Sequence, residues 1–307
     1  MRRSITVRVP ATSANCGAGF DVLGVALNIY NELTLTLTDD SELNISVEGQ
    51  GADSVPKDEQ NVVWKSVRFL LKKAGAEDCF SGGRLVMKNA VPLSRGLGSS
   101  AAAIVCGLKA ANVIVGNHFN RGELLNIATE IEGHPDNVAP AIYGGFTVNV
   151  TEKTKVHCFT FLPKIRLKFV VAIPDFHLPT REAREILPQN FTRDDAVYNI
   201  GHAAMLVAGL MNGSERFISL GLNDVMHQQY REKLVPGLAN VIVAAKDAGA
   251  LGAVLSGAGP AVIAYCGSRT NTNAIADAMK ETFAANGITA DTSILGVDTH
   301  GAHIVNH

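Results

Sequence analysis

The chain has 307 residues and a formal net charge of −2, from 27 Lys and Arg against 29 Asp and Glu. Hydrophobic residues make up 47% and charged residues 18%, a composition that excludes an intrinsically disordered protein. The nearly balanced charge argues against a nucleic-acid partner held through a broad basic face. No apolar run reaches the roughly 18 residues of a membrane span, and the N-terminus lacks the apolar core of a signal peptide. We therefore expect a soluble cytoplasmic protein with no membrane partner.

Strands and helices are interspersed in the first half of the chain. Alternation of apolar and polar residues predicts strands at 6–9, 33–37, 43–47, 84–89 and 146–150. Apolar residues at helical spacing predict helices at 61–73, 104–115 and 120–132, the last opened by a capping box. The strands at 33–37 and 43–47 flank an Asp-Asp-Ser turn, which predicts that they pair as a hairpin.

The second half has a different order of elements. It predicts a strand at 167–173, helical segments over 180–245, strands at 253–255 and 261–265, a helix at 272–285 and a strand at 293–297. That order is the split βαβ of ferredoxin-like domains with extra helices inserted. A polar stretch near 151–165 favours a boundary there, so we expect an α+β protein with domains at 1–160 and 161–307.

The most informative segment is Pro92-Leu-Ser-Arg-Gly-Leu-Gly-Ser-Ser-Ala-Ala102, between a predicted strand and a strong predicted helix. Its glycines allow close backbone approach, and the helix N-terminus exposes unpaired N–H groups, so the segment predicts a phosphate site. If this segment is considered alone, an ordinary glycine turn with a serine cap on the following helix is the alternative to a phosphate site. The Walker A lysine is absent. The spacing of the glycines also fits the fingerprint of dinucleotide-binding proteins. However, four residues separate the predicted strand from the glycines, so nicotinamide binding is only a remote alternative.

Three motifs, in order, resemble those of the GHMP kinases. The glycine-rich segment resembles the family's central phosphate-binding motif, and Leu255-Ser-Gly-Ala-Gly-Pro-Ala261 resembles its third motif. Val9-Pro-Ala-Thr-Ser-Ala-Asn-Cys-Gly-Ala-Gly-Phe-Asp21 and Glu132-Gly-His-Pro-Asp-Asn-Val-Ala-Pro140 are similar to segments of the homoserine kinase family in particular. The signatures expected of galactokinase and mevalonate kinase are absent. The resemblance implies an S5-like N-terminal domain, a ferredoxin-like C-terminal domain, ATP and Mg²⁺ as cofactors, L-homoserine as substrate and a homodimer.

The resemblance also implies a nucleotide site. Its residues are Pro92, Leu93, Ser94, Arg95, Gly96, Leu97, Gly98, Ser99, Ser100, Ala101 and Ala102, with Asn61 near the adenine. A helix N-cap explains Asn61 equally well. For the metal, Mg²⁺ prefers hard oxygens, so Ser99 with one carboxylate and phosphate oxygens suffices. Glu132 is the expected carboxylate because it lies at the edge of the predicted buried helix face, whereas Glu130 points away.

The substrate carries a carboxylate, an ammonium and a hydroxyl. Arg184 and Arg231 stand where the family's carboxylate-binding arginines fall, although solvated surface arginines are the ordinary alternative. The expected partners of the ammonium are Asn15, Asp21 and Asp136, and His134 is expected to line the same pocket or to be a turn residue.

For catalysis we expect Asn137 to orient the hydroxyl, Asp136 to bind substrate and Arg184 to act in the reaction, with Asp136 as general base an open alternative. Another GHMP small-molecule kinase or a non-catalytic sensor with the same fold remains an alternative reading of the whole chain.

Overall fold

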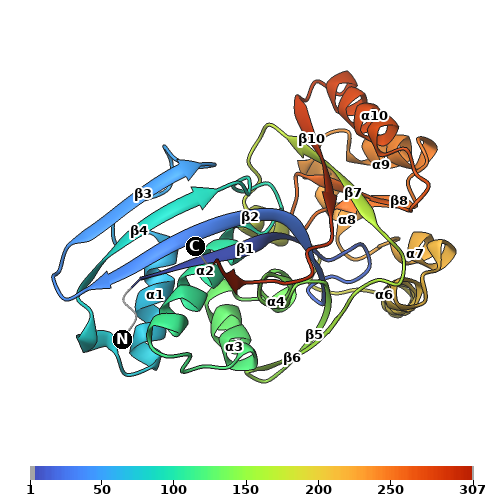
Figure 1. Cartoon of the computed structure of the whole chain (residues 1–307). Helices are drawn as coiled ribbons and strands as arrows, with labels where there is room; N and C mark the ends of the chain where they lie inside the picture. Colours follow the sequence, from blue (N-terminus) through green and yellow to red (C-terminus); the bar gives the residue numbers. More distant parts are fainter. Residues whose placement is uncertain (1–3, 306–307) are drawn as a thin grey trace.

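A computed structural model describes residues 4–305, which form two lobes, each built on its own sheet (Figure 1). The first sheet has seven strands, in the path β11-β1-β2-β4-β3, with β5 paired to β2 and β6 paired to β5. Their bounds are β1 (Ser4–Ala14), β2 (Leu23–Thr38), β3 (Leu43–Gly49), β4 (Gly82–Asn89), β5 (Phe146–Glu152), β6 (Lys155–Phe161) and β11 (His303–Ile304). Every pairing in it is antiparallel except that of β3 with β4.

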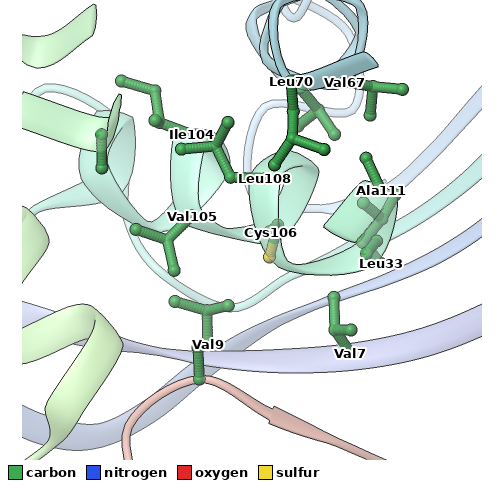
Figure 2. Packing of buried hydrophobic residues seen from close by; sticks show 14 of the residues in the cluster. Val7, Val9, Leu33, Val67, Leu70, Ile104, Val105, Cys106, Leu108 and Ala111 are labelled. Atoms are coloured by element: carbon green, nitrogen blue, oxygen red, sulfur yellow. The ribbon is translucent and has the colours of Figure 1, made fainter. Parts of the chain in front are cut away.

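Four helices cover one face of this sheet: α1 (Val62–Lys73), α2 (Ser99–Ile114), α3 (Arg121–Glu132) and α4 (Pro135–Tyr143) (Figure 1). The central one, α2, is apolar on almost every side because it is enclosed by other elements. Figure 2 shows Val67 and Leu70 of α1 against one side of α2, and Val7 and Val9 of β1 on the opposite side. This packing fixes the start of α2, where the glycine-rich segment enters the helix.

The second lobe has a four-stranded sheet in the order β10-β7-β9-β8. Its strands are β7 (Lys168–Pro174), β8 (Gly252–Leu255), β9 (Val262–Cys266) and β10 (Ala290–Gly296), and all their pairings are antiparallel. The helices are α5 (Thr180–Glu185), α6 (Arg193–Asn212), α7 (Glu215–Gly221), α8 (Gln228–Arg231), α9 (Leu238–Asp247) and α10 (Thr272–Ala285). The predicted split βαβ with inserted helices is confirmed.

The predicted hairpin of strands 33–37 and 43–47 is wrong. Residues 31–38 of β2 pair with β4, and β3 pairs with the far side of β4 in parallel. The physical reason lies in burial: β4 is largely enclosed, whereas β3 is exposed along one face and suits an edge. The sheet is not a doubly wound parallel sheet, so the dinucleotide alternative is also wrong.

Two further strands were not predicted. The polar stretch expected at a domain boundary contains β6, and residues 153–154 connect β5 to β6 in a hairpin. The last strand, β11, returns from the second lobe to pair with β1 of the first, with Val7 opposite Ile304. Within residues 4–305, no helix combines the length and the apolar character that a membrane crossing requires.

Candidate active site

A cavity of about 300 Å³ lies where the two lobes meet, and most of the predicted site residues line it. The lining residues that were predicted are Asn15, Asp21, Asn61, Leu93, Ser94, Arg95, Gly96, Gly98, Ser99, Ser100, Glu132, His134, Asp136, Asn137, Arg184 and Arg231. Four predicted nucleotide-loop residues do not line it: Leu97, Ala101 and Ala102 are buried among apolar side chains, and Pro92 is half-buried. These four support the loop from behind.

In the glycine loop, residues 90–98 between β4 and α2, four consecutive carbonyl groups accept hydrogen bonds from neighbouring segments. The carbonyl of Ser94 accepts from Leu178 N, and those of Arg95 and Leu97 accept from backbone N–H groups of the 256–261 loop and β1. The carbonyl of Gly96 accepts a 2.7 Å hydrogen bond from the Ser256 hydroxyl. Because N–H and C=O lie on opposite sides of a trans peptide, the N–H groups point the other way.

Backbone conformation in the glycine loop matches this orientation. The φ angle is positive at every second residue: +52° at Ser94, +77° at Gly96 and +66° at Gly98. Such alternation makes a concave nest of N–H groups that binds anions. A Cβ at Gly96 would overlap the Ser256 carbonyl, and one at Gly98 would overlap the Thr12 hydroxyl, so both positions require glycine.

Two further features of the loop suit a polyphosphate. The Nη1 of Arg95 is buried and, among residues 4–305, has no hydrogen-bond partner, while its Nη2 lies 3.2 Å from Asp175. The helix α2 begins at Ser99 without a side-chain cap, so its first N–H groups and the positive end of its dipole face the loop. The donor set present here therefore fits the phosphates of a nucleotide.

Glu132 ends α3 beside the start of α2. Its Oε2 accepts a 2.8 Å hydrogen bond from the hydroxyl of Ser100. Burial raises the pKa of Glu132, and the bond from Ser100 opposes that rise. Glu130 instead forms an ion pair with Lys73 away from the cavity. Within the described residues no three His, Cys, Asp or Glu side chains come together as a metal-binding group. The oxygen ligands that line the cavity beside the start of α2 are the Glu132 carboxylate and the hydroxyls of Ser99 and Ser100.

A pair of opposite charges, Asp21 and Arg184, also lines the cavity. Arg184 of α5 binds both carboxylate oxygens of Asp21, with Nη2–Oδ1 at 2.6 Å and Nη1–Oδ2 at 2.9 Å. That bond raises the pKa of the Arg184 guanidinium, although burial opposes it. Asp21 lies in the 15–22 loop between β1 and β2, where Asn15 accepts from the Asp21 N–H at 3.0 Å and donates to the Gly257 carbonyl at 3.0 Å.

Arg231 is not a surface residue: its side chain is 1% exposed. Its Nε donates to the carbonyl of Ala183 at 2.9 Å, and its Nη1 donates to that of Gly257 at 3.0 Å. Burial lowers the pKa of Arg231 to about 10, and the positive charge of Arg184 acts in the same direction. The solvated alternative is therefore wrong for Arg231, which stands fixed behind Arg184.

His134, Asp136 and Asn137 form a hydrogen-bonded row at the start of α4. His134 Nδ1 lies 2.5 Å from Asp136 Oδ1, and Asn137 Oδ1 accepts a 2.8 Å bond from the Thr12 hydroxyl. Burial lowers the pKa of His134, but the hydrogen bond and negative charge of Asp136 outweigh it and raise that pKa overall. The orientation of the Asn137 amide is thus fixed by Thr12, with its nitrogen on the side of Asp136 at 3.5 Å.

Asn61 is the N-cap of α1, as one of the two readings of the sequence predicted. Its side-chain oxygen accepts from Val63 N and Trp64 N, and its amide nitrogen donates to the Pro56 carbonyl at 2.7 Å. Sequence reasoning missed the roles of Thr12 and Ser256, although both lie inside quoted motifs. It also missed the fully buried His227, for which a single sequence carries no signal.

Comparison with known proteins agrees with this geometry. The GHMP kinases N terminal domain model matches residues 61–145, and the GHMP kinases C terminal model matches residues 205–285. A homoserine kinase of Desulfitobacterium hafniense is 40% identical, with 98% of this chain and 100% of that protein covered. One of Carboxydothermus hydrogenoformans is 42% identical, with 97% and 96% covered.

Solved structures give the same result. The crystal structure of homoserine kinase from Cytophaga hutchinsonii superposes with a TM-score of 0.89 at 35% identity and covers 99% of this chain and 98% of its own. A mevalonate diphosphate decarboxylase from Staphylococcus aureus shares the fold with a TM-score of 0.74 at 16% identity. Full-length identity of about 40% and both domain models lead to one conclusion: the chain belongs to the homoserine kinase family of the GHMP kinases.

Proposed function

We propose that this chain is a homoserine kinase, which transfers the γ-phosphoryl group of ATP to the hydroxyl of L-homoserine and releases ADP and O-phospho-L-homoserine. One observation carries the proposal. A single cavity is lined both by an anion-binding glycine loop and by the opposite charges of Asp21 and Arg184, which form its substrate end. The first suits a polyphosphate, and the second suits an amino acid that carries both a carboxylate and an ammonium.

The ion pair of Asp21 and Arg184 supports a mode of binding for the amino-acid part of the substrate. In the protein without substrate each charge satisfies the other. A zwitterionic substrate replaces this ion pair with two new ones. Its carboxylate binds the guanidinium of Arg184, with Arg231 behind it, and its ammonium binds the carboxylate of Asp21. Asn15 and Asp136 line the same cavity and add oxygens for the ammonium. A ligand with only one of the two charges leaves a partner unpaired, at a cost of about 1–3 kcal/mol.

The transfer itself needs positioning and charge neutralisation more than a strong base. The substrate oxygen forms a bond to the γ-phosphorus as the bond from that phosphorus to the ADP oxygen breaks. Asn137, fixed by Thr12, orients the hydroxyl. The hydroxyl proton leaves late, to a phosphate oxygen or water, because Asp136 is already engaged by His134 and Asn137. Arg184 and Arg95, which both line the cavity, supply positive charge to the reacting system.

For Mg²⁺, we propose the hydroxyl of Ser99 and the carboxylate of Glu132 as protein ligands. Both line the cavity beside the anion loop, and one carboxylate with phosphate oxygens and waters matches the preference of this ion. Bound there, the ion would neutralise phosphate charge during transfer. The hydrogen bond from Ser100 to Glu132 holds the carboxylate in the cavity wall.

The decisive experiment measures ADP release from Mg-ATP with L-homoserine, mevalonate, galactose or no acceptor. Turnover confined to homoserine is the expected result. Turnover with another alcohol would make the chain a different GHMP kinase. ATP binding without turnover on any acceptor would make it a non-catalytic sensor. An Asp136→Asn variant that loses turnover while retaining homoserine affinity would make Asp136 the general base.

We also propose a homodimer and a cytoplasmic location. The helix α6 supports the first, because Val197, Ile200 and Met211 stand 64%, 69% and 39% exposed on a helix with no charged side chain between residues 196 and 212. Ile200→Glu is expected to convert a dimer to a monomer in light scattering, and a wild-type monomer would contradict the dimer. Five free cysteines, three of them buried, support a reducing compartment.

A further inference from the structure

His227 is a fully buried side chain that contacts both the loop that carries Asp21 and the side chain of Arg231. It precedes α8 in the second lobe, and its ring stacks on Phe20 of the 15–22 loop with centroids 5.4 Å apart. The Nε2 lies 2.9 Å from the Gly17 carbonyl of that loop, and the Nδ1 lies 3.3 Å from Arg231 Nη1. His227 therefore joins the loop that carries Asp21 to the arginine behind Arg184.

The two partners fix which nitrogen carries the proton. A guanidinium is only a donor, so Nδ1 must be the unprotonated nitrogen that accepts from Arg231. A backbone carbonyl is only an acceptor, so Nε2 must carry the hydrogen that it donates to Gly17. Both contacts are satisfied by one species, the neutral ring with its proton on Nε2. Burial lowers the pKa of His227, although the charge of Asp224 opposes this, and the neutral form is favoured.

The loop held by His227 has an unfavourable backbone. The φ angle is positive at Asn15 (+69°), Cys16 (+48°) and Asp21 (+57°), a conformation that side chains other than glycine seldom adopt. Such a loop persists only where its surroundings hold it. Hydrogen bonds to two consecutive carbonyls hold the loop. His227 donates to the carbonyl of Gly17, and Asn199 of α6 donates to that of Ala18 at 2.9 Å.

Asp224 fixes the position of His227 itself. Its carboxylate accepts from the backbone N–H groups of Met226, His227 and Gln228 at 3.1, 2.9 and 2.8 Å, and from the Asn199 amide at 3.1 Å. Asp224 Oδ2 also lies 3.6 Å from the His227 Nε2. These contacts fix the position of the His227 ring. Through its two hydrogen bonds, the ring in turn fixes the positions of the loop and of Arg231.

We propose that His227 is a positioning residue for the amino-acid substrate: by donating from Nε2 to Gly17 and accepting at Nδ1 from Arg231, it sets the distance between the Asp21 loop and the arginine pair that together receive the substrate's two charges. It touches no substrate atom. The inference rests on the proposed homoserine kinase activity for its kinetic consequence, but the proton position on the ring is independent of any activity.

The kinetic test compares two substitutions of one residue with a matched control. His227→Phe keeps an aromatic ring to stack on Phe20 and removes both polar contacts. His227→Gln restores a donor and an acceptor. The control, His157→Phe, makes the same exchange on the solvent side of β6, where the ring is 52% exposed. We expect His227→Phe to raise the KM for homoserine about ten- to fiftyfold, because two buried partners lose a hydrogen bond. The KM for ATP should change less than about threefold, and His227→Gln should recover most of the loss.

A second measurement is made on the wild-type protein and uses a variant only to assign one resonance. Nitrogen-15 histidine NMR of the wild-type protein should show His227 with Nε2 protonated and Nδ1 bare, assigned by the resonance missing in His227→Gln. A proton on Nδ1 would overturn the proposal, as would an unchanged KM for homoserine in His227→Phe. If the KM values for homoserine and for ATP rise equally in His227→Phe and do not recover in His227→Gln, the role of His227 is merely structural. That result would also overturn the proposal. Wild-type protein inactive on homoserine would instead refute the proposed function, and the NMR result would still decide the proton position.

Discussion

The sharpest test of the substrate end replaces Arg184 with lysine. The guanidinium of Arg184 makes two parallel hydrogen bonds to Asp21, at 2.6 and 2.9 Å, and the same fork is proposed to receive the substrate carboxylate. Lysine keeps the positive charge but offers a point donor rather than a planar fork, so one charge-assisted bond is lost. Such a bond contributes about 1.5–3 kcal/mol when well buried. The two side chains are 35% and 34% exposed, which places the loss near 1–2 kcal/mol, or a five- to thirtyfold fall in kcat/KM for homoserine.

The assay couples ADP release to NADH oxidation over a range of homoserine concentrations at saturating Mg-ATP, and then reverses the roles of the two substrates. Arg181→Lys is the matched control, because Arg181 lies on the same helix, is 89% exposed and pairs only locally with Glu185. The control should leave kcat/KM for homoserine within about twofold of wild type. If Arg184→Lys also stays within that range, or if the KM for ATP rises equally, Arg184 does not bind the substrate carboxylate.

Three further outcomes are expected. Gly98→Ala should weaken ATP binding by more than about tenfold in calorimetry, because its Cβ would overlap a β1 threonine hydroxyl, whereas Gly116→Ala, equally left-handed but in open space, should not. Asn61→Ala should cost about 1 kcal/mol of helix capping and lower Tm by about 2–4 °C in differential scanning fluorimetry; an unchanged Tm would contradict the capping role. The pKa of His134 is raised above 6.5 by Asp136, so its stabilising contribution is full below about pH 6.5 and is lost as pH rises through the higher value. The Tm of wild type minus that of His134→Gln should therefore shrink as pH rises, and a constant or growing difference would refute the ion pair.

Elements dictated by local sequence were predicted closely. The helix at 272–285 has the predicted bounds, and the capping box at Asn120 and Glu123 forms as expected. Strand pairing was the weak point, because it depends on which distant strand is better buried. A hairpin-like turn precedes β3, but β3 does not pair with β2. The strand that pairs with β2 there is β4, which begins 33 residues after the end of β3.

In the candidate site, too, features set by local sequence could be predicted, and features set by distant segments could not. Backbone-binding segments such as the glycine loop have a recognisable spacing, since only glycine tolerates the close contacts at Gly96 and Gly98. The burial of Arg231 had no such signal, because an arginine in a polar stretch is ordinarily solvated. Its environment is assembled by the carbonyls of Ala183 and Gly257, which lie far away in sequence. The resemblance named Arg231 as a site residue, but nothing in the sequence indicated that backbone carbonyls of other segments bury and hold its side chain.

The loop at 256–261 shows why both lobes are needed for one site. The Ser256 hydroxyl holds the Gly96 carbonyl at 2.7 Å, which orients the glycine loop. The next residue, Gly257, accepts from both Asn15 and Arg231 at 3.0 Å, which orients the substrate end. One turn of the second lobe thus sets the distance between the phosphate nest and the paired charges. In-line transfer tolerates little error in that distance. Damage to this turn should therefore affect the KM values of both substrates, whereas damage at Arg184 should affect the KM for homoserine.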